Sequence, residues 1–222
     1  MLQTMPQDSR LRQPDITRID AVDYTVRRGS ITRGCAMSAM LSLWLPILLS
    51  AVFVFIVSSV VHMFLGYHNK DWSPVPDEDA FRRAVRPLGL PPGDYMVPRC
   101  TSMKDMGSPD YQAKLNEGPV LMMTVLANRV HPMGKSLTLW FLHCIVVSAF
   151  VAYLAAHAFP MVADDRAVFG FVAVAAFAAY GLADIPYSIW MSRSWATTLR
   201  NLFDALLYAL VTAGTFGWLW PA

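Results

Sequence analysis

The sequence predicts an all-α transmembrane fold: a four-helix membrane bundle with a small α+β extramembrane loop between helices 1 and 2. Of its 222 residues, 55% are hydrophobic and only 15% are charged, whereas soluble domains carry about 25% charged residues. Four long apolar segments account for this deficit. Each is long enough to supply the roughly 20 helical residues that cross a hydrocarbon core of about 30 Å. None has the polar face that a helix of a soluble bundle requires.

The four apolar segments are the predicted membrane-spanning helices. They cover residues 41–65, 137–159, 167–190 and 202–220. Asp184 interrupts the third segment and Asp204 interrupts the fourth. A central Asp opposes insertion by about 2.5–3.5 kcal/mol, but about fifteen apolar neighbours, contributing roughly −0.3 to −0.6 kcal/mol each, outweigh it. We therefore expect both segments to insert.

These segments divide the chain into four parts. Residues 1–36 are polar and show no apolar period, so we expect a disordered tail. Met37 and Met40 stand just before the first apolar segment, and translation from either one would omit this tail. The remaining parts are transmembrane helix 1 in 37–67, the extramembrane loop region in 68–136 and transmembrane helices 2–4 in 137–222.

The loop region contains signals for two short helices and two short strands. The helices are expected over 77–88, with acids in the first turn, and over 108–117, with Ser108 as N-cap and Gly118 as the stop. The strands are expected over 91–98 and 120–126, and they can pair with each other. A region of this size cannot bury a large core, so we expect it to lean on the membrane surface or on a partner.

Small residues indicate which helices pack closely, because lipid offers no hydrophobic drive for association between helices. They recur every four residues in the last two apolar segments, as Ala175, Ala179 and Ala183 in the third and as Ala205, Ala209, Ala213 and Gly217 in the fourth. We therefore expect helices 3 and 4 to form a tight antiparallel pair through these stripes.

Polar residues occur at one depth in all four predicted helices. Because successive helices alternate in direction, His62, His143, Asp184 and Asp204 fall on the same side, one to two turns inside their helix ends. Tyr180 and Arg200 lie one helical turn from the two aspartates and extend this polar layer, and Arg200 could pair with Asp204. Ionisable groups within the membrane commonly mark ligand, proton or ion sites. The alternative is a purely structural layer, since groups near helix ends also reach headgroup water.

Three function hypotheses follow from different classes. The first is a non-enzymatic accessory or scaffold subunit that uses the loop as its contact surface and needs no cofactor, because no catalytic motif is present. The second is a small transporter, channel or proton-relay component that uses the polar layer. The third is a b-type haem protein with His62 and His143 as axial ligands, or a metal site made of His62, His143, Asp184 and Asp204. A net charge of +2 without a basic stripe excludes nucleic acid as a partner, so the expected partners are the lipid bilayer and a membrane protein or a second copy.

Several stretches resemble an uncharacterised family of small bacterial inner-membrane proteins with four transmembrane helices. They are SSVVHM (58–63), PPGDYMVP (91–98), MKDMGSP (103–109), EGPV (117–120), IPYSIWMSRSW (185–195) and DALLYALVTAGTFGWLWP (204–221). The resemblance covers about residues 41–221 and implies the same fold and a multi-pass location in the bacterial inner (cytoplasmic) membrane. It implies no reaction. Members of that family begin close to the first span, and residues 1–36 depart from this pattern.

Overall fold

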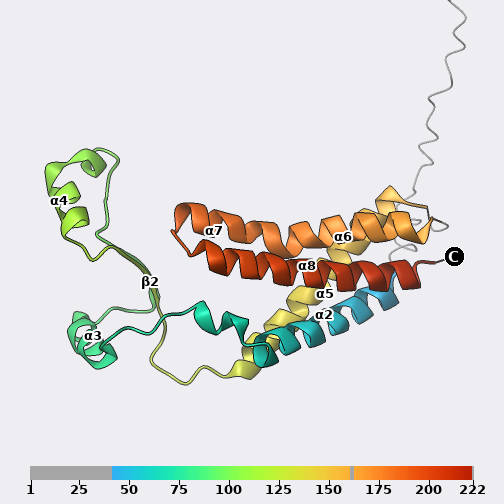
Figure 1. The fold of residues 1–222 in the computed structure, drawn as a ribbon, viewed down its shortest axis with the longest axis horizontal. Helices are drawn as coiled ribbons and strands as arrows, with labels where there is room; N and C mark the ends of the chain where they lie inside the picture. Colours follow the sequence, from blue (N-terminus) through green and yellow to red (C-terminus); the bar gives the residue numbers. More distant parts are fainter. Residues whose placement is uncertain (1–41, 161–162, 222) are drawn as a thin grey trace, which may run out of the picture.

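The computed structural model describes residues 42–160 and 163–221, so the predicted tail over 1–36 lies outside the described residues. Within them, four helices are long and apolar enough to cross a membrane. They are α2 (Trp44–Phe64), α5 (Met133–Ala158), the α6–α7 pair (Asp165–Gly181 and Ile185–Trp190) and α8 (Trp195–Leu219). Helix α8 packs against both α6 and α2, and α5 also packs against both of them, which closes a four-helix bundle (Figure 1).

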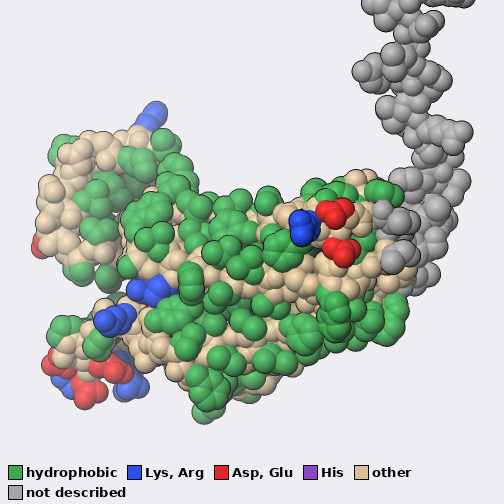
Figure 2. All heavy atoms as spheres, turned by 45° about the vertical axis from the view of Figure 1, so that its right-hand side comes forward, with side chains coloured by type: hydrophobic (Ala, Val, Ile, Leu, Met, Phe, Trp, Pro, Cys, Tyr) green, Lys and Arg blue, Asp and Glu red, His purple; other side chains and the backbone are tan. Residues whose placement is uncertain are grey.

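The bundle buries small and hydroxyl-bearing side chains together with some larger apolar ones such as Phe216, and many other apolar side chains are exposed on its outside. Ser50, Ser148 and Thr212 are fully buried, whereas Val146 and Val174 are 64% and 72% exposed. The Ser50 and Thr212 hydroxyls donate to backbone carbonyls of their own helices, so they need no partner elsewhere. Figure 2 shows hydrophobic side chains spread over the visible flank of the bundle. This distribution is the one expected of helices whose solvent is lipid.

Helices α6 and α8 pack closely, but the buried stripe on α6 differs from the predicted one. On α8, the predicted residues Ala205, Ala209 and Ala213 are buried. On α6 the buried residues are Val168, Val172 and Ala176, while Ala175 and Ala179 are half-buried beside them and Ala183 is exposed. Ala175 and Ala179 lie at the edge of this stripe, three residues after Val172 and Ala176. Ala183 is displaced from it because α6 ends at Gly181 and a 3-10 turn over Leu182–Asp184 follows.

Gly181 marks the closest approach of α6 to α8. A Cβ atom built on Gly181 would lie 2.8 Å from the Ala205 Cβ and 3.2 Å from the Leu202 Cδ2. Only glycine therefore fits at this crossing, which combines a small residue on each helix. At the other end of the pair, a Cβ on Gly217 would meet Phe169 at 3.6 Å, an ordinary contact.

The segment from Gly66 to Pro132, called the loop unit below, contains both predicted helices and both predicted strands. Helix α3 (Glu78–Val85) is capped by Asp77, and α4 (Pro109–Glu117) is capped by Ser108 and followed by Gly118. Strands β1 (Gly93–Val97) and β2 (Leu121–Val125) pair antiparallel, with Tyr95 opposite Met123. Figure 1 shows α3 and α4 beyond one end of the bundle, joined by the hairpin. No residue of the loop unit is buried, so it has no core of its own.

Candidate functional site

Polar side chains from three segments meet where the chain leaves α2 and enters the loop unit; we call this place the junction. The chain turns sharply after α2 because Gly66 adopts a left-handed conformation with a φ of 62°. A 3-10 helix over Tyr67–Lys70 follows and places the side chains of Tyr67, His68 and Asp71 against the first turns of α8. These residues are thereby brought to the predicted site residues Asp204 and Arg200.

The buried carboxylate of Asp204 forms the centre of the junction, and its side chain is only 6% exposed. The Tyr67 hydroxyl donates to Asp204 Oδ1, and the His68 Nε2 lies 2.8 Å from Asp204 Oδ2. His62 Nε2, on the last turn of α2, is 4.0 Å from the same Oδ2. Burial and the hydrogen bond to Asp204 raise the pKa of Tyr67 well above its usual value. The tyrosine therefore remains protonated and serves as a permanent donor.

A second carboxylate, Asp71, joins the junction to the guanidinium of Arg200. The Arg200 Nε donates to Asp71 Oδ1 at 2.7 Å, and the His68 Nδ1 donates to Asp71 Oδ2 at 2.6 Å. Burial alone would raise the pKa of Asp71, but the hydrogen bonds from His68 and Arg200 outweigh it and hold the pKa below its ordinary value. Asp71 is therefore a carboxylate at neutral pH. The expected pairing of Arg200 with Asp204 is not the one the structure shows.

The other predicted members of the polar layer lie in two separate places. The exposed His143 stacks on Trp140, with ring centroids 5.4 Å apart, and meets the edge of Tyr180 at 6.0 Å. Asp184 accepts a hydrogen bond of 2.7 Å from the side chain of Asn201. The structure therefore keeps only His62, Arg200 and Asp204 of the predicted layer at the junction.

The structure does not bring together all the residues of either ligand set that the sequence suggested, the haem pair or the four-residue metal site. His62 stacks on His68, with centroids 4.5 Å apart and an interplanar angle of 6°, whereas His143 stacks on Trp140. The two histidines of the expected haem pair, His62 and His143, therefore stack on different side chains. Among the described residues, the three side chains whose ligand atoms converge within 4.8 Å of one another are His62, His68 and Asp204. His68 therefore takes the place that the sequence interpretation gave to His143 and Asp184.

Sequence reasoning missed Tyr67, His68 and Asp71 because it treated them as the beginning of a loop. The signal was present in the order Gly-Tyr-His-Asn-Lys-Asp directly after the first apolar segment. A glycine after a helix end reverses the chain direction, so the following residues return to the same end of the bundle. Antiparallel topology places the start of the fourth helix at that end, where Arg200 and Asp204 lie.

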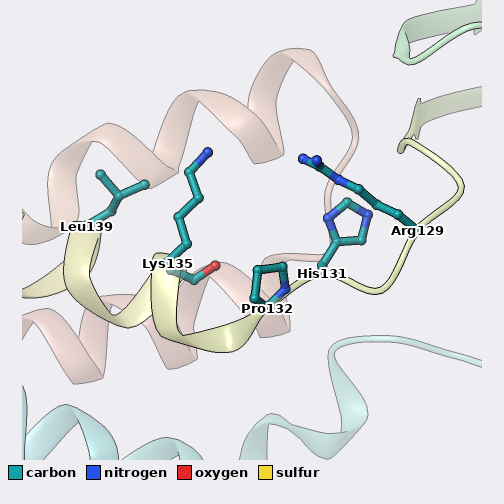
Figure 3. A pocket seen from close by; sticks show the side chains of 6 residues that line it. Arg129, His131, Pro132, Lys135 and Leu139 are labelled. Carbon is teal, nitrogen blue, oxygen red and sulfur yellow. The ribbon is translucent and has the colours of Figure 1, made fainter.

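A hollow of about 350 Å³ lies apart from the junction, where the loop unit returns to α5. Figure 3 shows Arg129, His131 and Lys135 around it, together with Pro132 and Leu139. All five of these residues are exposed. We place the candidate site at the junction instead, because there Asp71, His68 and Asp204 are largely buried and hydrogen bonded to one another, as functional groups commonly are.

No family model matches the chain, and comparisons with curated proteins and with solved structures found no match. The class of protein is therefore defined by the structure: a chain with four helices, among its described residues, that are long and apolar enough to cross a membrane, and with a small two-stranded sheet.

Proposed function

We propose that this protein is a non-enzymatic accessory or scaffold subunit of the bacterial inner membrane, and that it binds a partner protein through its loop unit. One observation carries the proposal: the helices and strands of the loop unit have formed, but none of their residues is buried. Helices of eight and nine residues are too short to persist alone in water. An isolated two-stranded hairpin is also marginal. A surface from another molecule would supply the missing burial.

The hairpin favours an extended segment of a partner protein as the occupant. The sheet has two strands, and neither outer edge is paired with a further strand in the described residues. An unpaired edge is a template for another strand. Met96 and Met122 lie opposite each other and are 42% and 43% exposed. Flexible methionine side chains of this kind adapt to an apolar partner.

The bilayer is a poorer candidate for covering this surface. Figure 1 shows the loop unit extending past the end of the bundle along its long axis, rather than folding back over the flank of the helices. Residues 67–71, near the start of the loop unit, form its root. Contacts of Asp71 with Arg200 and of His68 with Asp204 hold this root in that place. The compartment follows from the four apolar helices together with the resemblance to bacterial inner-membrane proteins.

Position-specific photo-cross-linking in intact cells tests the proposal. A photoreactive residue at Met96 or Met122 should give an adduct with a second, different protein, whereas the same probe at Arg83 on the exposed surface of α3 should give none. Mass spectrometry of the adduct identifies the partner. An adduct of twice the 24.7 kDa chain would show self-association instead. Lipid adducts alone, or equal protein adducts from all three positions, would also overturn the proposal.

A further inference from the structure

The two histidines of the junction present the same ring atom to the same carboxylate oxygen. His62 Nδ1 lies 3.0 Å from the carbonyl oxygen of Ser58, and His68 Nδ1 lies 2.6 Å from Asp71 Oδ2. Carbonyl and carboxylate oxygens only accept hydrogen bonds, so both Nδ1 atoms carry the proton. In the neutral rings, both Nε2 atoms are therefore unprotonated, and they lie 2.8 Å (His68) and 4.0 Å (His62) from Asp204 Oδ2.

The ligand atoms of His62, His68 and Asp204 lie within 4.8 Å of one another, close enough for one ion to contact all three. We infer that His62, His68 and Asp204 bind a divalent transition metal ion, with Zn²⁺ as the ion that this ligand set fits best. Imidazole nitrogen and carboxylate oxygen are the ligands that Zn²⁺ takes in sites with three protein ligands and one open position. The soft thiolate ligands that select other metals are absent from the described junction residues.

The ligand atoms stand close to the spacing that a tetrahedral ion requires. Zinc bonds of about 2.0–2.1 Å place two ligand atoms about 3.3 Å apart. Oδ2 of Asp204 is 2.8 Å from His68 Nε2 and 4.0 Å from His62 Nε2. The first distance must open and the second must close, each by about half an ångström or slightly more. Because an ion lies in the plane of each imidazole that binds it, the parallel stack of His62 on His68 must also open, by rotation of the half-exposed His62 ring.

The surroundings of the histidines are those of metal ligands. A ligating histidine characteristically donates its other N–H to a carboxylate or a backbone carbonyl, which fixes the ring and makes the ligating nitrogen more basic. His68 has the first kind of support from Asp71, and His62 has the second from Ser58. Arg200 pairs with Asp71, whereas no guanidinium or ammonium group of the described residues contacts the carboxylate of Asp204, so a bound cation would meet a negative charge there.

The site is also accessible. The His62 side chain is 52% exposed, whereas those of His68 and Asp204 are 14% and 6% exposed. An ion held on the His62 side would reach solvent and keep a water molecule as its fourth ligand. The competing occupant is a proton on His68 Nε2, which would make the ring a cation between Asp71 and Asp204. Metal binding would replace this proton and release it to solvent.

Equilibrium dialysis with Zn²⁺ tests the inference on the full chain, purified in detergent with a tag that contains no histidine. We expect one Zn²⁺ per chain, and Co²⁺ at the same site should give the strong visible absorption of a tetrahedral complex. His62→Gln and Asp204→Asn should abolish or greatly weaken binding. Asp71→Asn, which keeps all three ligands but removes the carboxylate that supports His68 and pairs with Arg200, should weaken it by about 10–100-fold. Mg²⁺ should not compete, because it prefers oxygen ligands.

His157→Gln is the matched control. His157 Nδ1 also lies close to the backbone carbonyl four residues earlier, at 2.8 Å from Tyr153, but His157 belongs to no group of converging ligands in the described residues. This variant should bind Zn²⁺ as the wild type does. Because the His62 side chain is half exposed, we expect His62→Gln to fold as the wild type does, which a size-exclusion profile checks. Absence of stoichiometric Zn²⁺ binding, or equal binding by wild type and His62→Gln, would show that the junction holds only a proton. Neither result would bear on the partner of the loop unit.

Discussion

The ion pair between Asp71 and Arg200 should behave as a strongly coupled unit that fastens the loop unit to the bundle. The perturbation is the set of Asp71→Asn, Arg200→Gln and the double variant. Asp71 and Arg200 come from positions 129 residues apart, and their side chains are 9% and 23% exposed. Replacing either one alone leaves the other partly desolvated and without its charged partner.

The expected magnitude lies between the values for exposed and for fully buried pairs. A hydrogen bond to a charged group contributes about 1.5–3 kcal/mol, and breaking a fully buried pair costs about 3–5 kcal/mol. Because about a quarter of the Arg200 side chain reaches solvent, we expect each single variant to lose about 2 kcal/mol. The double variant should lose only slightly more, which gives a coupling energy of about 1.5 kcal/mol.

Equilibrium unfolding in detergent micelles, followed by tryptophan fluorescence, measures the four free energies of unfolding that the cycle needs. The matched control is the Glu78–Arg82 pair, which is also an acid with an arginine. Its atoms are 3.9 Å apart and its side chains are 74% and 59% exposed. An exposed pair at this helical spacing contributes about 0.3–0.5 kcal/mol.

Additive losses would refute the reasoning. If the double variant lost the sum of the two single losses, Asp71 and Arg200 would stabilise the fold independently. The pair would then not be a coupled unit that fastens the loop unit to the bundle. A coupling energy equal to that of the Glu78–Arg82 pair would have the same meaning, because burial would then contribute nothing to the interaction.

Two glycines should be intolerant of substitution for different physical reasons. For Gly181→Leu, a Cβ alone would already lie 2.8 Å from the Ala205 Cβ, so we expect the free energy of unfolding to fall by about 1–3 kcal/mol in the same assay. The control is Gly217→Leu, at the looser end of the α6–α8 pair. Equal losses for the two variants would contradict the argument. Gly66→Ala forces a φ of 62° on a residue with a Cβ, so we expect a loss of about 1–2 kcal/mol. The same substitution at Gly134, whose Cβ would meet nothing within 4 Å, should be harmless; a neutral Gly66→Ala would show that the turn is not needed.

The local elements of this fold could be predicted because each has its own sequence signal. Apolar segments of more than 18 residues identified the four long helices. Ser108, Pro109 and Gly118 marked the ends of α4. The register of α6 could not be predicted from small residues alone. The stripe ending at Ala183 assumes an uninterrupted helix, but the 3-10 turn at Leu182–Asp184 breaks the period.

Only some residues of the candidate site could be predicted from the sequence. Depth within the membrane identified His62 and Asp204, because helix length and topology determine depth. Depth does not determine which side chains face one another across a bundle, so His143 and Asp184 shared the level of the site without reaching it. The missing members came from the chain just outside the span, where Gly66 reverses its direction.

The origin of the partners of Asp204 explains why a loop unit without a core can still hold a defined position. A buried carboxylate is strongly destabilising unless donors surround it. In this bundle, the Tyr67 hydroxyl that donates to Asp204 and the His68 ring beside it belong to the root of the loop unit rather than to the four long helices. Undocking the root would therefore remove both side chains from Asp204 and separate Asp71 from Arg200 at the same time. The root of the loop unit is thus held against α8 by contacts within this chain.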